Sequence, residues 1–407
     1  MQQNVIIVGG GLCGASAAEA LREGGFTGRI TLIGDELDPA YERPSLSKEY
    51  LQGHHTADDL LIKPVSWYSD RSIETRLGTR VARVLDQDRK VELVGGELLP
   101  FDHLLIATGG RPRRLPGETS ERVLYLRTRE DADRIKPHLA PGRHLVVIGA
   151  GFIGAEVAAS ARRLGVEVTV LEALDVPLGR VLGEEIGKVY AAIHQDEGVD
   201  LRTGEAVLSI RETQSGHPVV HTASGAAIEC DAVLVGIGMV PNVEIAEGTG
   251  IKIDNGIVVD EFCRTTVDGI FAAGDVARQY HPLFDRHIRA EHYDNAIRQG
   301  RTAAEAMLGN GRPLDDPHWF WSDQYDYNLQ YIGSSDGWDQ IVVRGSFDER
   351  KFTAFYLNQG VVRAALAVNR PKDILRAKKM IRTGARVDVA DLQNEDVDLK
   401  AVLRKGA

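Results

Sequence analysis

The chain has 407 residues, which corresponds to two or three domains, so a single small binding module is excluded. It carries 48 lysines and arginines against 59 aspartates and glutamates, and this net charge of −11 disfavours a nucleic-acid partner. No stretch reaches the roughly 18 apolar residues of a membrane span, and no basic or cleavable leader opens the chain. We therefore expect a globular cytoplasmic protein without a membrane anchor.

The first dinucleotide motif lies near the start of the chain, and a second copy follows at residues 144–172. Each copy has an apolar run, the pattern G-x-G-x-x-G, an alanine-rich helical stretch and a second apolar run followed by an acid. The three glycines permit a tight turn, close approach of a pyrophosphate and close packing of the helix, while the acid accepts ribose hydroxyls. The predicted binding residues are Gly9, Gly11, Cys13, Gly14 and Asp35 (or Glu36) in the first copy, and Gly149, Gly151, Phe152, Ile153, Gly154 and Glu172 in the second.

Two dinucleotide sites in one chain indicate a flavin in one and a nicotinamide in the other, with hydride passing between them. Two further strands, within 104–112 and 269–277, end in glycine, and they add Ala107, Thr108, Gly109, Gly274 and Asp275 to the expected flavin contacts. Asp275 is placed to accept a hydrogen bond from a ribityl hydroxyl. Glu172 has no nearby basic residue to receive a 2′-phosphate, which predicts NADH rather than NADPH. Arg180 is a secondary candidate for the cofactor's phosphates.

Cysteine and histidine spacing argues against a redox disulfide and against a metal site. The three cysteines are isolated, without C-x-x-C or C-x4-C, and no histidines have metal-ligand spacing. We expect the thiol of Cys13 to be a small buried hydrophobic group. The spacing therefore predicts neither a redox dithiol nor a metal site.

Together these motifs resemble the family of FAD-dependent NADH:ferredoxin reductases, which includes putidaredoxin reductase and the ferredoxin reductases of aromatic-ring dioxygenases. This family is similar in fold to glutathione reductase but lacks its redox disulfide. Because the segment around RPSLSK contains no cysteine, the resemblance implies a mechanism that uses the flavin alone. Besides the two glycine motifs, the resemblance is carried by YERPSLSKEYL (41–51), YLRTRED (125–131), GIGMVPN (236–242), RAEHYDNAIRQGRTAA (289–304), WFWSDQY (319–325) and VNRP (368–371).

The resemblance implies an α/β fold with two Rossmann-like dinucleotide-binding domains and a C-terminal α+β domain. The FAD-binding domain would comprise residues 1–107 and 240–316, with the NAD-binding domain at 108–239 inserted between its two parts. The C-terminal domain would comprise residues 317–407.

The resemblance also implies two catalytic residues, Lys48 and Glu156. The ammonium of Lys48 would stabilise negative charge on the reduced flavin, and Glu156 would pair with this lysine. The simpler alternative is that both are exposed helix residues. Further cofactor contacts are implied for Arg43, Pro44, Val81, Arg127, Gly238, the backbone of Tyr293, and Trp321, although Trp321 fits ordinary core packing equally well.

The activity implied is electron transfer from NADH through FAD to a small 2Fe-2S ferredoxin, which would feed a haem-thiolate monooxygenase or a Rieske-type dioxygenase. The alternatives are a rubredoxin reductase, a flavin-only NADH oxidase or quinone reductase, and a non-catalytic nucleotide-sensing scaffold resembling apoptosis-inducing factor. Retention of both glycine motifs, Lys48 and Glu156 argues against the scaffold.

A basic segment of the acidic chain is the candidate docking surface for the ferredoxin. Residues 370–386 hold seven lysines and arginines against one acid, Asp373. Such a run is often only the solvated face of a helix. Because ferredoxins of this type are generally acidic, we expect Lys378, Lys379, Arg382 and Arg301 to steer the partner.

Overall fold

The computed structural model describes residues 3–117 and 120–405, and the chain forms two compact units. Unit 1 consists of the chain up to Glu42, Leu60–Arg111 and Val240–Trp319. Unit 2 consists of Arg43–Asp59, Pro112–Met239 and the chain from Phe320 onward. The expected NAD-binding and C-terminal domains thus fall in one unit, together with the RPSLSK segment. The three-domain division of the sequence stays a prediction.

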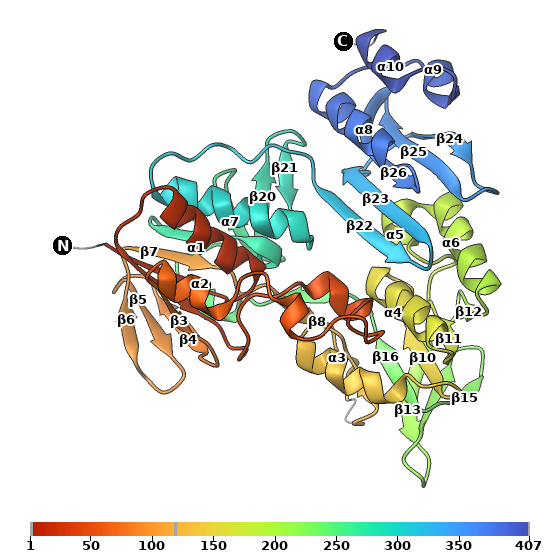
Figure 1. Ribbon diagram of the computed structural model, residues 1–407, viewed down its shortest axis with the longest axis horizontal. Helices are drawn as coiled ribbons and strands as arrows, with labels where there is room; N and C mark the ends of the chain where they lie inside the picture. Colours follow the sequence, from red (N-terminus) through yellow and green to blue (C-terminus); the bar gives the residue numbers. More distant parts are fainter. Residues whose placement is uncertain (1–2, 118–119, 406–407) are drawn as a thin grey trace. The chain divides into compact units, whose positions relative to one another are not determined.

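Unit 1 is built on a five-stranded parallel sheet with the strand order β19-β7-β1-β2-β3. Its central strands are buried apolar runs, because helices and a second layer cover both faces. Helices α1 (Leu12–Glu23) and α7 (Tyr293–Met307) pack on each other (Figure 1), and α2 is Val65–Asp70. The strands are β1 (Asn4–Val8), β2 (Arg29–Ile33), β3 (Ile73–Arg76), β7 (His103–Ile106) and β19 (Ile270–Ala272).

Two three-stranded sheets complete unit 1. The first is antiparallel and contains β4 (Val81–Leu85), β5 (Lys90–Leu93) and β6 (Leu98–Pro100). The second contains β18 (Ile257–Val259), β20 (Ala277–His281) and β21 (Arg286–Ile288). Apolar side chains of the parallel sheet and of both small sheets share one buried cluster. The short strands β8 (Gly110–Pro112) and β17 (Met239–Pro241) lie where the chain passes between the units.

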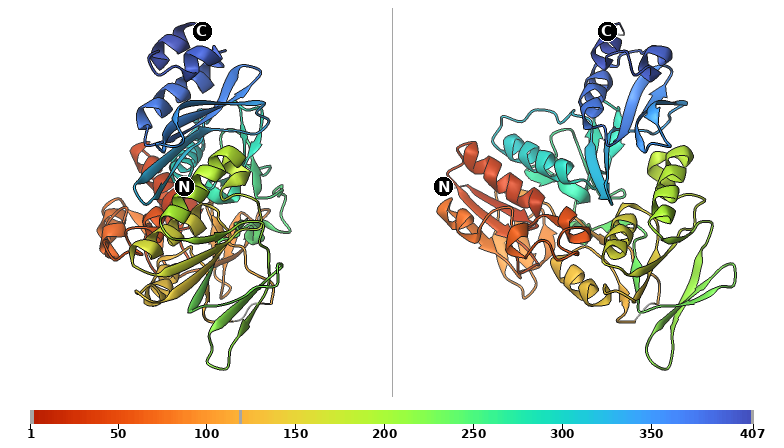
Figure 2. Two further views of the ribbon diagram at one scale, coloured as in Figure 1. Left: turned by 90° about the vertical axis from the view of Figure 1, so that its right-hand side faces the viewer. Right: turned by 45° about the vertical axis from the view of Figure 1, so that its right-hand side comes forward.

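Unit 2 contains a second parallel sheet, with the order β12-β11-β10-β16-β9. An antiparallel hairpin layer extends from it, drawn in green in Figure 2. The parallel strands are β9 (Val123–Leu124), β10 (His144–Ile148), β11 (Glu167–Leu171), β12 (Asp200–Arg202) and β16 (Ala232–Val235); the hairpin layer is β13 (Val207–Glu212), β14 (Pro218–Thr222) and β15 (Ala227–Glu229). The helices are α3 (Arg129–Ile135), α4 (Phe152–Arg163), α5 (Gly179–Leu182) and α6 (Glu184–Asp196).

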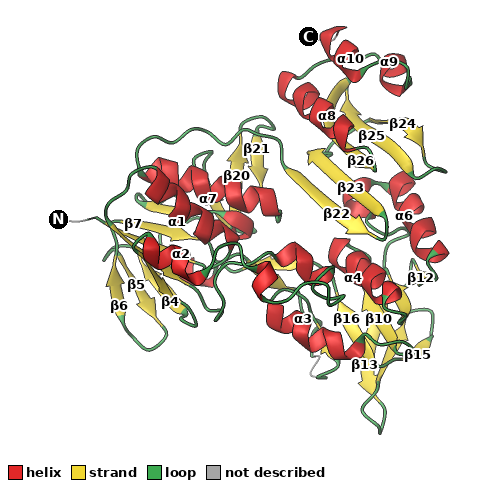
Figure 3. Ribbon diagram, viewed as in Figure 1, coloured by secondary structure: helices red, strands yellow, loops and turns green. Residues whose placement is uncertain are grey.

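The C-terminal part of unit 2 is a five-stranded sheet with the order β22-β23-β26-β25-β24 (Figure 3). Its strands are β22 (Trp319–Gln324), β23 (Tyr327–Gly333), β24 (Gln340–Ser346), β25 (Lys351–Asn358) and β26 (Val361–Val368). Side chains of α5 and α6 share its apolar core, and α8 (Pro371–Thr383) packs on β23 and β26. Short helices α9 (Val389–Gln393) and α10 (Leu399–Lys405) end the chain. Across residues 3–117 and 120–405, no helix combines the length and apolar character needed to span a bilayer.

Candidate functional site

The first glycine motif, in unit 1, has no room for side chains at two of its glycines. Gly9 has φ of +125°, and a Cβ there would lie 2.1 Å from the carbonyl oxygen of Ala107. A Cβ on Gly14 would lie 2.0 Å from the carbonyl oxygen of Gly9, so α1 starts directly against the turn. Gly11 is the N-cap of α1, and no side chain caps the helix. Open N–H groups at a helix start suit the pyrophosphate of FAD.

The second motif, in unit 2, repeats this geometry. Gly149 has φ of +95°, with a Cβ position 2.6 Å from the carbonyl oxygen of Gly236, and a Cβ on Gly154 would lie 2.1 Å from that of Gly149. At Gly151 the nearest atom to a Cβ is 3.9 Å away, which leaves open space over the start of α4. Phe152 and Ile153 are the first residues of α4. These features fit a second pyrophosphate.

The acid of the second copy is fixed in place by backbone groups. One oxygen of Glu172 accepts from the N–H of Ala150 at 2.7 Å and the other from that of Leu174 at 2.9 Å. A carboxylate has about four lone-pair sites, so ribose hydroxyls can still donate to it. The same unit contains two further predicted cofactor contacts, Gly238, which has φ of +101°, and Arg180, which is exposed on α5.

The first copy has a glycine where the second has its acid. The N–H of Gly9 donates to Ile33 as that of Gly149 donates to Leu171, both at 2.8 Å, so Gly34 is the counterpart of Glu172. Asp35 follows Gly34 and is exposed. Glu36 is half-buried and accepts from the hydroxyl of Tyr41 at 2.5 Å. Contact of Asp35 with the ribose therefore stays a prediction, and the structure leaves Glu36 as its alternative.

The loop that carries Asp275 is held by a buried amide on α7. The N–H of Gly274 donates to Gln299 Oε1 at 2.7 Å, and Gln299 Nε2 donates to Gln279 at 2.8 Å. The next residue, Gly300, touches α1 so closely that a Cβ would lie 2.5 Å from the carbonyl oxygen of Cys13. Helix packing in unit 1 therefore determines where Asp275 lies.

The remaining predicted flavin contacts of unit 1 are ordered by neighbouring groups. Thr108 donates its hydroxyl to the carbonyl of Asn242 at 2.7 Å, and Gly109 has φ of +65°. Val81 is buried at the start of β4. Tyr293 is the first residue of α7, and burial together with the charge of Glu42 raises its pKa to about 12.

The three cysteines are free and buried. Burial, and next the charge of Asp275, raises the pKa of the Cys13 thiol; burial likewise raises the pKa of Cys263, and that of Cys230 to about 12. Thiolate is the reactive form of cysteine, and these sites disfavour it. The arrangement offers no thiol for redox chemistry.

In unit 2, Lys48 and Glu156 form a buried ion pair, with 2.8 Å between Lys48 Nζ and Glu156 Oε2. The 3₁₀ helix η1 (Arg43–Ser47) leads directly into Lys48, whose ammonium also donates to the carbonyl of Pro44 at 3.1 Å. The lysine and glutamate side chains are only 9% and 5% exposed, so they are not solvated helix residues. Their catalytic role stays a prediction.

Two serines that the sequence analysis did not single out complete the surroundings of Glu156. Ser47 donates to Glu156 Oε2 at 2.6 Å, and Ser322 donates to Oε1 at 2.7 Å. The signal for Ser322 was the period-two alternation of WFWSDQ, in which Phe320, Ser322 and Gln324 are buried. The carboxylate thus accepts from three donors that point inward.

The other predicted flavin contacts of unit 2 include Arg43, Arg127 and Trp321. Arg43 donates to the carbonyl of Arg127 at 2.7 Å, which ties RPSLSK to YLRTRED. Trp321 is half-buried, on the face of β22 opposite Ser322. Its cofactor contact stays a prediction.

The expected docking residues lie on two helices. On α8, Lys379 and Arg382 are exposed and Lys378 is half-buried. Leu375, one turn before Lys379, is 68% exposed. Arg301 lies on α7 in unit 1 and forms an ion pair with Glu23 at 2.8 Å, so part of its charge is neutralised.

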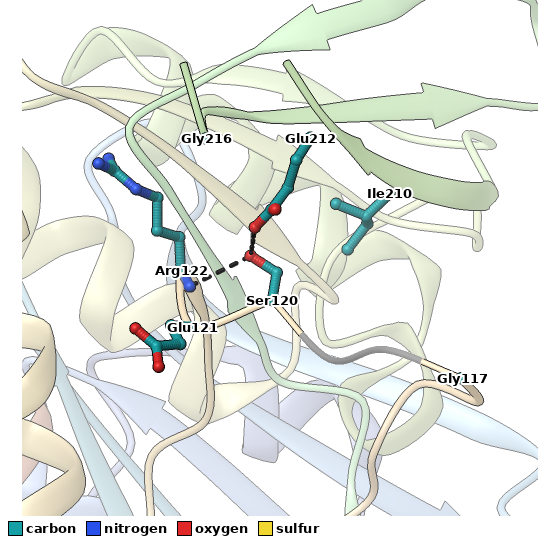
Figure 4. Close-up of a pocket in the computed structure, with 7 residues that line it drawn as sticks. All are labelled: Gly117, Ser120, Glu121, Arg122, Ile210, Glu212 and Gly216. Atoms are coloured by element: carbon teal, nitrogen blue, oxygen red, sulfur yellow. Dashed lines mark hydrogen bonds between the residues drawn. The ribbon is translucent and has the colours of Figure 1, made fainter. Parts of the chain in front are cut away.

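A hollow of about 560 Å³ in unit 2 contains none of the predicted site residues (Figure 4). Ser120 in its wall donates to Glu212 Oε1 at 2.6 Å and accepts from the N–H of Arg122 at 3.2 Å. Ser120, Glu212 and the backbone of Arg122 are thus bonded to one another in this wall. Within the part of the chain that the structure describes, no three histidine, cysteine or acidic side chains gather as metal ligands.

Two parallel sheets, each ending in a glycine turn shaped for a pyrophosphate, define a protein that binds two dinucleotides. Residues 3–300 match the pyridine nucleotide-disulphide oxidoreductase family, and residues 319–403 match the reductase C-terminal family. The chain belongs to the pyridine nucleotide-disulphide oxidoreductase family. It is therefore an oxidoreductase, of a family that uses FAD and NADH.

The chain is similar to known proteins over its whole length. Rhodocoxin reductase of Rhodococcus erythropolis is 39% identical, covering 99% of this chain and 95% of the relative. The ferredoxin–NAD(+) reductase component of the anthranilate 1,2-dioxygenase system of Burkholderia cepacia is also 39% identical, covering 98% of both. The reductase in the crystal structure of the covalent putidaredoxin reductase–putidaredoxin complex has 38% identity and a TM-score of 0.96, covering 99% of both chains. The predicted family resemblance and fold class are confirmed.

Proposed function

We propose that this chain is an NADH-dependent flavoprotein reductase that passes electrons from NADH through FAD to a 2Fe-2S ferredoxin. The observation that carries the proposal is the full-length match to a reductase crystallised in a covalent complex with putidaredoxin. The reductase components named above support the same activity. The acceptor would in turn feed a haem-thiolate monooxygenase or a Rieske-type dioxygenase. Three free cysteines accord with a reducing compartment, and we propose the cytoplasm.

Each glycine motif is assigned one cofactor in this proposal. When bound, FAD would accept a hydride from NADH and release electrons one at a time. The N–H groups at the start of α1 would bind the pyrophosphate of FAD, and those of α4 that of NADH. Glu172 would accept from the adenosine ribose of NADH and repel the 2′-phosphate of NADPH. Asp275 would orient the ribityl chain.

Lys48 is assigned as the cation that stabilises negative charge on the flavin, and Glu156 as its partner. A charge fixed in a buried site stabilises a developing opposite charge more than a mobile one in water. Glu156, with Ser47 and Ser322, holds the ammonium in a single position. The further flavin contacts that we propose are Arg43, Pro44, Val81, Arg127, Tyr293 and Trp321.

The exposed face of α8 is the proposed docking surface for the ferredoxin. Lys372, Leu375, Lys379 and Arg382 follow one another at helical spacing and are exposed. An apolar residue among positive charges suits an acidic partner that buries a small apolar contact. Lys378 and Arg301 are retained as weaker contributors, since Lys378 is half-buried and Arg301 already pairs with Glu23.

The test is NADH-driven reduction of cytochrome c by the purified holoprotein, with and without candidate 2Fe-2S ferredoxins. A strong requirement for a ferredoxin supports the proposal. Turnover with rubredoxin alone would instead indicate a rubredoxin reductase, and rapid turnover with oxygen or quinone alone a flavin-only oxidase or quinone reductase.

The docking surface is tested by reversing Lys379 and Arg382 to Glu. Rim charges act mainly on association rate and are screened beyond about 8 Å at physiological salt. The double variant should therefore lose ferredoxin-dependent turnover at low salt but keep NADH-to-ferricyanide turnover. The control is Arg211→Glu, an exposed arginine of β13. If the double variant matches the parent at every ionic strength, α8 is not the docking site.

A further inference from the structure

The ion pair of Lys48 and Glu156 is the inner end of a longer hydrogen-bonded chain within unit 2. Behind Ser322, Gln324 Nε2 donates to Ser322 Oγ at 3.1 Å. Gln324 Oε1 lies 2.9 Å from His194 Nε2, and the hydroxyl of Tyr325 lies 3.2 Å from His194 Nδ1. The chain joins α4, β22 and α6, and its inner members are buried: Glu156, Ser322, Gln324 and His194.

The direction of every donor in this chain follows from the carboxylate outward. The Glu156 carboxylate pairs with the Lys48 ammonium and offers only acceptor oxygens, so the Ser322 hydroxyl must donate to it. Ser322 Oγ then accepts from the Gln324 amide nitrogen, which leaves Gln324 Oε1 facing His194.

That oxygen can only accept, so His194 must carry a proton on Nε2, and in the neutral ring Nδ1 then accepts from the Tyr325 hydroxyl. Burial lowers the pKa of His194 to about 4, which keeps the ring neutral at pH 7. A neutral imidazole with one donor and one acceptor nitrogen is the ring that this arrangement needs.

We propose that His194 is a positioning residue for the Lys48–Glu156 pair and acts through Gln324 and Ser322. Its Nε2–H fixes the orientation of the Gln324 amide, the amide fixes the Ser322 hydroxyl, and the hydroxyl holds one oxygen of Glu156. The other oxygen stays free for Lys48 and Ser47. The inference rests on the proposed function, because it gives a role to the ion pair in that reaction.

The first test is the tautomer of His194, read by nitrogen-15 NMR of histidine-labelled holoprotein at pH 7. The His194 signals are assigned by their loss in His194→Gln. The neutral ring protonated on Nε2 is expected. The ring protonated on Nδ1 alone would overturn the proposal, because Nε2 would then carry no proton to donate to Gln324 Oε1.

The second test is the rate of flavin reduction by saturating NADH, measured in a stopped-flow instrument. His194→Leu removes the donor and should slow reduction roughly fivefold, the value of one hydrogen bond. His194→Gln places an amide N–H near the same position and should restore the rate to within about twofold. In a Ser322→Ala background, His194→Leu should cost nothing further, because the link to Glu156 is already cut.

The matched control is Tyr190→Phe, one turn earlier on α6. The Tyr190 hydroxyl is buried and makes no hydrogen bond within the described part of the chain, so its removal should leave the rate unchanged. Equal slowing by His194→Leu in both backgrounds, or no rescue by His194→Gln, would refute the positioning role. If NADH does not reduce the parent flavin, the proposed function fails, while the tautomer still decides the geometry of the chain.

Discussion

Removing one member of the Lys48–Glu156 pair should destabilise the protein far more than removing both. In Glu156→Leu the buried ammonium keeps, among the residues that the structure describes, only the carbonyl of Pro44 as a partner. In Lys48→Met the carboxylate keeps Ser47 and Ser322 but loses its countercharge. Each single substitution should lower the free energy of unfolding by about 3–5 kcal/mol, because an uncompensated buried charge remains. The double substitution leaves no charge, so the coupling should be about 2 kcal/mol or more.

The assay is urea unfolding of the four proteins of this double-mutant cycle at one pH and salt concentration. The control cycle uses Glu184 and Lys188 on α6, an ion pair with 2.5 Å between its charged atoms but side chains 69% and 65% exposed. Its coupling should be too small to resolve, because water screens exposed pairs. If the effects of Lys48→Met and Glu156→Leu add to within about 0.5 kcal/mol, the pair is not a buried coupled unit and the reasoning is wrong.

Three further predictions follow from burial and charge. Replacing all three cysteines with serine should leave the rate of flavin reduction by NADH within a few-fold of the parent, because the buried thiols disfavour the reactive thiolate. Loss of reduction in a folded, FAD-loaded variant would contradict a flavin-only mechanism. Glu172→Ala should weaken NADH use roughly tenfold to a hundredfold, the value of a charged hydrogen bond, and narrow the preference over NADPH in steady-state assays; equal use of both cofactors by the parent would contradict the assignment. Burial lowers the pKa of His194 to about 4 and of His318 to about 3, so below about pH 6.5 the unfolded chain binds protons that the native chain does not. As the pH is lowered from 6.5 to 4, the free energy of unfolding should therefore fall by up to about 1.4 kcal/mol per pH unit for each histidine. If the variant with both His194→Gln and His318→Gln shows the same slope of unfolding free energy against pH as the parent, the prediction is wrong.

The two nucleotide-binding motifs were predictable because each is local. Strand, turn and helix follow one another within about 30 residues, and the glycine positions are set by contacts inside that unit. The first copy shows the limit of such reasoning. Gly34 occupies the place of the expected acid, and the sequence pattern alone could not show whether Asp35 or Glu36 replaces it.

Contacts between distant segments could not be predicted from the sequence. The hydrogen bonds from Ser322 to Glu156 and from His194 to Gln324 join residues more than 100 positions apart. A serine or a histidine carries no periodic signal for its partner. The same holds for the half-exposed Arg301, whose place on a helix could be expected but whose pairing with Glu23 could not.

Gly300 is not one of the predicted cofactor contacts, but its close packing makes the retention of FAD sensitive to a substitution there. A methyl group there would meet the backbone of Cys13 and push α7 away from α1. Gln299 would move with the helix, and its amide would leave the N–H of Gly274 that precedes Asp275. We therefore expect the Gly300→Ala protein to fold but to be colourless, because it does not retain FAD. Mutational surveys scored only by expression would miss it, whereas surveys scored by yellow colour would group it with the flavin ligands.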